Sequence, residues 1–141
     1  MSGLNTQEFH ALMEQLARAW SRQDTETALA CFSPDAAYVE PPDIQFFQGH
    51  EQLRPYFAAL KSGIFMRFHN IWFDEARQVG AGEYSFGSAG KATANHGVAV
   101  VELHAGKIAF WREYQHTGPS TFQDFIGTEG KTWQWHKGNY P

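Results

Sequence analysis

Three side chains in this sequence have the chemistry to move a proton near neutral pH: Glu40, His96 and Glu113. In general, apolar walls raise the pKa of a carboxyl group, which can then take a proton from a carbon next to a carbonyl. A histidine can act as acid, base or hydrogen-bond donor in the same pH range. Each residue also has a structural interpretation, as a solvated strand-end side chain or, for Glu113, as half of a charged pair with Arg112.

Signals for other chemistries are weak. None of the seven histidines forms an H-x-H or H-x-x-x-H pair, although ligands that converge from separate strands leave a metal site open. The sequence has no Ser/His/Asp or Cys/His nucleophile signature, no phosphate-binding glycine loop and no dinucleotide fingerprint. The single cysteine, Cys31, lies on an apolar helical stretch that is typical of a core position. We therefore expect neither a cofactor nor a metal.

Length and composition indicate one globular domain. A chain of 141 residues with 43% hydrophobic side chains can bury a core and still leave a pocket. The aromatic content of 16% fills that core or lines a cavity. Eleven basic residues are scattered among fifteen acids, which argues against nucleic acid. The central apolar run 98–101 is far too short to span a membrane, and residues 1–10 lack the pattern of a signal peptide, so we expect a cytoplasmic protein.

The elements that must position these residues begin with three helices. Asn5, with Glu8 three residues later, predicts the cap of a first helix whose apolar residues recur at helical spacing. Asp24 predicts the cap of a short second helix that ends before Pro34. A third helix is expected over 50–61, with its first turn shifted or kinked by Pro55.

The remainder of the chain is predicted to form a sheet. Expected strands cover 36–40, 64–73 and 78–86, and a hairpin joins 97–103 to 107–114. The stretch around Phe46 and Phe47 is expected to be a loop, and Ser120 is expected to cap a short helix that ends at Ile126. Helices first and strands afterwards predict an α+β fold. Because the last strands are apolar on both faces, we expect the free sheet face to pair with a second copy as a homodimer.

Three segments, in this order, resemble SnoaL-like domains, which are related to nuclear transport factor 2. They are residues 20–41; residues 47–57, with the spacing G-x-x-x-[IL]-x-x-[FY][FY] from Gly49 to Phe57; and residues 106–114, with Trp111-Arg112-Glu113-Tyr114 in the last strand. The resemblance runs from about residue 9 to 116 and implies a cone-shaped α+β barrel. In it, three N-terminal helices pack on a curved, mostly antiparallel sheet and close a deep apolar pocket. It implies one domain over 1–141, with 117–141 as a C-terminal extension.

The resemblance also suggests roles. Its enzymes include ketosteroid isomerase, limonene epoxide hydrolase, scytalone dehydratase and the SnoaL-type cyclases, and other members only bind ligands or serve as scaffolds. Glu40 stands where an isomerase has its general base, but Leu16 and Val98 occupy the positions of the oxyanion-hole donors and cannot donate. The comparison turns His96, Val98, Trp111 and Glu113 towards the pocket, with the remaining walls supplied by Trp20, Tyr38 and Phe57.

Three functions follow as hypotheses. The first is a cofactor-independent isomerase, cyclase, dehydratase or epoxide hydrolase in which Glu40, His96 and Glu113 handle protons on an apolar, oxygen-bearing molecule. The second is a non-catalytic protein that binds a small apolar ligand in the same pocket. The third is an interaction module that works through its sheet face. No partner among nucleic acids or membranes is expected.

Overall fold

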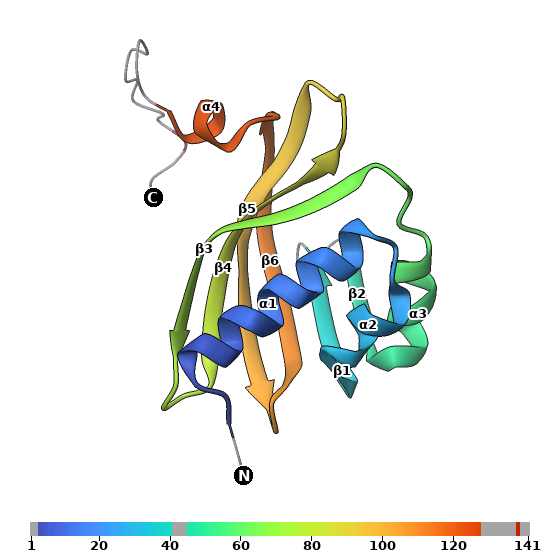
Figure 1. Ribbon diagram of the computed structural model, residues 1–141, viewed down its shortest axis with the longest axis vertical. Helices are drawn as coiled ribbons and strands as arrows, with labels where there is room; N and C mark the ends of the chain where they lie inside the picture. Colours follow the sequence, from blue (N-terminus) through green and yellow to red (C-terminus); the bar gives the residue numbers. More distant parts are fainter. Residues whose placement is uncertain (1–2, 41–44, 128–137, 139–141) are drawn as a thin grey trace.

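The computed structural model describes residues 3–40, 45–127 and 138. They form an α+β fold in which N-terminal helices cover one face of a curved, six-stranded, mostly antiparallel sheet (Figure 1). The elements are α1 (Thr6–Ser21), α2 (Thr25–Ala30), β1 (Phe32–Glu40), β2 (Gln45–Gln48), α3 (Gly49–Ala58), β3 (Ile64–Asp74), β4 (Val79–Ser88), β5 (Thr93–His104), β6 (Lys107–Pro119) and α4 (Phe122–Ile126). Pro41 and Pro42, which follow β1, and the tail aromatics Trp133, Trp135 and Tyr140 lie outside the described residues.

The helices begin where their caps predict. At α1, the Asn5 side chain accepts from the backbone N–H of Glu8, and the Glu8 carboxylate accepts from the backbone N–H of Asn5, which satisfies two otherwise free donors. Asp24 caps α2 by accepting from the backbone N–H of Thr27. In α3, Pro55 is the seventh residue of the helix. The helix ends at Ala58, before the predicted end at 61.

The sheet order is β2-β1-β6-β5-β4-β3, with β1 and β6 parallel and every other pair antiparallel. The N-terminal half of the chain is thus joined to the C-terminal strand at the β1–β6 pair. The expected loop around Phe46 and Phe47 is wrong, because residues 45–48 pair with β1 as β2. Four residues are too few for a periodic signal in the sequence, and this strand forms through its pairing with β1.

The core lies between the helices and the inner sheet face. Phe9, Met13 and Leu16 of α1 are fully buried against it. Glycines in β4 make room for this helix, since a Cβ at Gly80 would lie 2.5 Å from the Phe9 ring. Next to this contact lies a cluster of buried rings from α1, β1, α3 and β6, which pack edge-on or tilted except for the parallel pair of Tyr38 and Trp111: Trp20, Phe32, Tyr38, Phe57 and Trp111.

The short helix α4 packs on the opposite, outer face of the sheet. Phe122 stacks on His69 of β3 at 3.8 Å, and Phe125 stacks on His96 of β5 at 4.3 Å. The predicted helix is present, but its cap is Thr121 rather than Ser120: the Thr121 side chain accepts from the backbone N–H of Asp124. Within the described residues, no helix combines the length and apolar character needed to cross a membrane.

Candidate functional site

A small cavity opens between α1, α3 and the inner face of β1, β3, β4 and β6. About 30 Å³ is free inside it, which is room for roughly two water molecules. Two carboxyl groups and one amide face this space, and the other walls are aromatic or aliphatic. The lining residues are Trp20, Tyr38, Glu40, Tyr56, Phe57, Leu60, Met66, Phe86, Glu113 and Gln115.

Two donors hold Glu40 at one side of the cavity, and a third hydroxyl faces it. Its Oε2 accepts from the hydroxyl of Tyr56 at 2.8 Å and faces the hydroxyl of Tyr38 at 3.3 Å. Its Oε1 accepts from the amide nitrogen of Gln115 at 3.0 Å. Its position as the last residue of β1 keeps it half-buried, so that it lies between the core and the cavity mouth. This carboxylate is oriented from both oxygens, as a proton acceptor of fixed direction must be.

Glu113 lies deeper, with only 4% of its surface exposed, and accepts from the Tyr38 hydroxyl at 2.9 Å. Burial, followed by the hydrogen bond and the repulsion that it shares with Glu40, holds the pKa of Glu113 well above its usual range. The neighbouring hydroxyls of Tyr84 and Tyr38 act in the opposite direction and do not outweigh burial. Glu113 is therefore the carboxyl group of this pair that holds a proton more readily than an exposed glutamate does.

The tyrosines around this pair remain neutral donors. Burial is the largest cause that raises the pKa of Tyr38 and Tyr56, and the neighbouring carboxyl groups raise both further. The same causes raise the pKa of Tyr84, whose hydroxyl donates to Oε1 of Gln115 at 2.9 Å. Because that oxygen is occupied, the Gln115 amide turns its NH₂ group towards Glu40. A chain of hydrogen bonds thus runs from Tyr84 through Gln115 to Glu40.

The arrangement places a proton acceptor, Glu40, beside a proton donor, Glu113, in a cavity whose other walls are mostly aromatic or aliphatic. Water-poor surroundings strengthen each of these interactions, because little solvent screens them. Within the described residues, no group of three or more His, Cys, Asp or Glu side chains is arranged to hold a metal ion.

Five of the residues singled out from the sequence line this cavity: Trp20, Tyr38, Glu40, Phe57 and Glu113. Trp111 lies behind the wall instead, fully buried, with its ring parallel to Tyr38 and edge-on to Trp20.

His96 and Val98 do not line the cavity, and the inward direction expected for them is corrected. In the β5–β6 pairing, Ala99 lies opposite Glu113 and Val98 lies opposite the exposed Tyr114. Because neighbouring residues of a strand point to opposite faces, residues 96 and 98 lie on the outer face. The family comparison was offset by one residue, and an offset of one reverses every side chain of a strand.

Sequence reasoning missed three polar residues of the network: Tyr56, Tyr84 and Gln115. Gln115 could have been predicted, since it continues the alternation of Trp111 and Glu113 along β6. Tyr56 directly precedes Phe57 in the third-helix motif. Tyr84 carried no signal, because its role depends on the partner strand that brings it beside Gln115.

Comparisons with known proteins agree with the fold. The family described as SnoaL-like domain matches residues 13–111, which is more than half of the chain. Among curated proteins, no sequence matches this chain. The fold is NTF2-like.

Three solved structures illustrate this fold. An LEH-like epoxide hydrolase from M. tuberculosis is 19% identical, with a TM-score of 0.65 over 79% of this chain and 84% of its own. A putative ketosteroid isomerase from Kribbella flavida is 13% identical, with a TM-score of 0.67 over 86% and 88%. A computationally designed 17-OHP binder is 17% identical, with a TM-score of 0.60 over 76% and 95%. At these identities the likeness concerns the fold alone.

Proposed function

The chain belongs to the SnoaL-like domain family, and on that premise we propose that its inner cavity is the active site of an acid/base enzyme. The substrate is a small, apolar, oxygen-bearing molecule, and part of the lining must move apart to admit it, because the cavity as described has only about 30 Å³ free. The observation that carries the proposal is the pair formed by Glu40 and by Glu113, whose pKa is raised by burial, in a cavity with mostly aromatic and aliphatic walls. An acid and a base held in different environments on the same site are what proton-transfer catalysis requires.

The reaction that this pair supports best is proton transfer at a carbon next to a carbonyl. Glu40 removes the proton, and the electron pair of the broken C–H bond moves into the carbonyl to form an enolate. The Glu113 carboxyl and the Tyr38 hydroxyl donate hydrogen bonds to the developing oxyanion, and for this Tyr38 gives up the hydrogen bond that it donates to Oε1 of Glu113. Glu40 then returns the proton to a second carbon, so the substrate is isomerised without a net change in atoms. These donors take the place of those that Leu16 and Val98 cannot provide.

The same acid and base also serve dehydration, cyclisation and epoxide hydrolysis. In an epoxide hydrolase, Glu113 would give its proton to the ring oxygen while Glu40 takes one from the attacking water, and water or substrate later restores both groups. The apolar walls from Trp20, Phe57 and Met66 select an apolar body in each case. The epoxide hydrolase and putative ketosteroid isomerase with this fold make both classes reasonable first screens.

The test uses Glu40→Gln and Glu113→Gln, assayed against enones, epoxides and hydroxy-ketones. With an active substrate, we expect Glu40→Gln to lose about 10²–10⁴-fold in kcat, because the base is removed and the shape is kept. Glu51→Gln, an exposed change in α3, is the matched control and should leave kcat unchanged. A substrate turned over equally well by wild type and Glu40→Gln would rule out the proposed base.

A second candidate is ligand binding without chemistry. It is favoured by the closed hydrogen-bond network around Glu40, which leaves that carboxylate satisfied without a substrate, and by the computationally designed 17-OHP binder with this fold. Under this alternative, a ligand found by thermal-shift screening is recovered unchanged after incubation, and Glu40→Gln weakens its binding only modestly. Conversion of the ligand by wild type but not by Glu40→Gln decides for the enzyme.

We also propose that the outer sheet face pairs with a second copy of the chain. Trp72 is 54% exposed and Tyr114 51% exposed on that face, and half-buried Val98 and Val100 lie between them in the sheet. Exposed aromatic side chains among apolar neighbours are typical of an association surface. Light scattering at micromolar concentration should give the mass of a dimer, and Tyr114→Lys should reduce it to that of a monomer. A monomeric wild-type chain would contradict this pairing.

A further inference from the structure

A second and larger cleft lies on the outer face, between β3, the β4–β5 loop and α4. Its volume is about 490 Å³, within the range of small-molecule sites. The lining residues are Phe65, Arg67, His69, Ser85, Ser88, Ala89, Gly90, Lys91, Ser120, Thr121, Phe122 and Gln123. None of them lines the Glu40 cavity, because Arg67 and Ser85 point to the face opposite Met66 and Tyr84.

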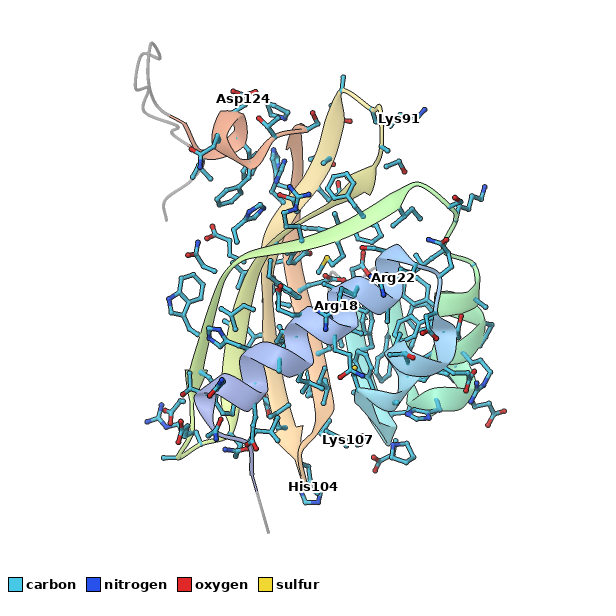
Figure 2. All side chains as sticks on the ribbon, viewed as in Figure 1. Arg18, Arg22, Lys91, His104, Lys107 and Asp124 are labelled. Carbon is cyan, nitrogen blue, oxygen red and sulfur yellow. The ribbon has the colours of Figure 1, made fainter. Side chains whose placement is uncertain are left out.

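The charge of this outer cleft is positive. Arg67 and Lys91 line it, no Asp or Glu does, and neither cation forms an ion pair within the described part of the chain. This is unexpected in a chain of net charge −4, in which a random surface cleft would carry acids. Figure 2 shows Lys91 on the β4–β5 loop and Asp124 on α4, the two elements that border the cleft. Asp124 belongs to α4 but is not part of the lining.

The floor of the outer cleft is a built polar structure. Ser85 is 3% exposed, and its Oγ lies 2.7 Å from Nε2 of His69 and 2.7 Å from Nδ1 of His96. Nε2 of His96 lies 2.6 Å from the carbonyl oxygen of Pro119, which can only accept, so this nitrogen donates. The Ser85 hydroxyl can donate to one of these two imidazole nitrogens and accept from the other. The serine and both imidazoles are therefore fixed before any ligand arrives.

The rim adds groups that can donate to an anion. Ser88 and Ser120 bring hydroxyls from the two bordering segments, and the Thr121 oxygen accepts from a backbone N–H, which leaves its hydroxyl proton available. The rings of Phe65 and Phe122 form the apolar part of the wall, and Phe122 is held in place by its stack on His69. Cations, hydroxyls and flat rings on one surface match a ligand with one anionic end and one flat apolar end.

We propose that the outer cleft is a binding site for a small organic anion, a phosphate monoester or a carboxylate carried on a flat apolar body. Arg67 and Lys91 neutralise the anionic group, the rim hydroxyls orient it, and Phe65 and Phe122 contact the flat body. The site is separate from the Glu40 cavity and does not depend on the chemistry proposed there.

Titration calorimetry with four probes tests the proposal: phenyl phosphate, benzoate, inorganic phosphate and phenol. We expect saturable binding of phenyl phosphate or benzoate, weaker binding of inorganic phosphate, and none of phenol. The stronger of the first two identifies the anionic group. Arg67→Gln and Lys91→Gln should each weaken binding about tenfold or more, since each removes a charge-assisted hydrogen bond. Lys61→Gln, an exposed lysine outside the cleft, is the matched control and should bind as wild type does.

Two results would overturn the proposal. One is the absence of saturable binding of any anionic probe by the wild-type chain at millimolar concentration. The other is binding that Arg67→Gln and Lys91→Gln leave unchanged while their thermal unfolding matches wild type. Glu40→Gln separates this site from the inner cavity, because it should bind the anionic probes with wild-type affinity even if it has lost every activity.

Discussion

Replacing Glu113 by Gln should change how the stability of this protein depends on pH. Glu113 is almost fully buried, and burial together with Glu40 raises its pKa well above the unfolded value of about 4.3. The folded state therefore binds the proton more tightly than the unfolded state. The stabilisation is fully present below the unfolded pKa and is lost as pH rises towards the folded pKa, by up to about 1.4 kcal/mol per pH unit for one group.

Glu113→Gln carries no titratable group at this position, so its free energy of unfolding should lack this slope. The assay is urea unfolding followed by tryptophan fluorescence at pH 5, 6, 7 and 8 for both proteins. His69, whose pKa is lowered chiefly by burial, gives a slope of opposite sign near pH 6, but it does so in both proteins and cancels in the difference. The free energy of unfolding of the wild type minus that of Glu113→Gln should fall by about 1 kcal/mol per pH unit between pH 5 and 7. Parallel curves would refute the assignment of a neutral Glu113.

Three further changes test the network and the core. Tyr84→Phe removes the donor that fixes the Gln115 amide and should cost about 1–3 kcal/mol in urea unfolding, while an unchanged free energy would show that this hydrogen bond is replaced by water. Tyr56→Phe removes a hydrogen bond to Glu40 and should lower kcat more than it raises KM on any active substrate; a change in KM alone would assign Tyr56 to binding. Gly80→Ala places a methyl group 2.5 Å from the Phe9 ring and should lower stability by about 1–3 kcal/mol, whereas Gly90→Ala, with open space at a loop, tests the backbone strain of a positive φ alone.

Local signals in the sequence were sufficient for the helical half of the fold. The capping residues Asn5 and Asp24 and the apolar spacing of α1 act over a few residues, so they can be predicted without knowledge of the partner elements. The strand β2 could not be predicted in the same way, since its four residues are ordered by pairing with β1. The existence of a strand depends on pairing with another strand, even one as near in sequence as β1 is to β2, whereas a helix cap depends only on residues of its own turn.

The candidate site shows the same division. Glu40 and Glu113 were predicted from their residue types and from the family resemblance, but the contact between them depends on the parallel pairing of β1 with β6. The sheet face to which a strand residue points was harder to predict, because an error of one residue in the alignment placed His96 and Val98 on the wrong face. Tyr84 could not be found at all, because its partner Gln115 is 31 positions away and two strands across the sheet.

Strand alternation in β4 also explains how one thin sheet can serve two independent sites. Tyr84 points inward and closes the network that orients Glu40, while the next residue, Ser85, points outward and forms the floor of the outer cleft. The two side chains share a backbone but no hydrogen bond, and no residue lines both the inner cavity and the outer cleft. Changes at one site should therefore leave the other intact, provided that the β4 register is kept. A double variant of Glu40→Gln and Arg67→Gln should show additive effects on turnover and anion binding, because additivity is expected for sites without shared partners. An interaction between the two changes would mean that the sheet itself shifts when either site is altered.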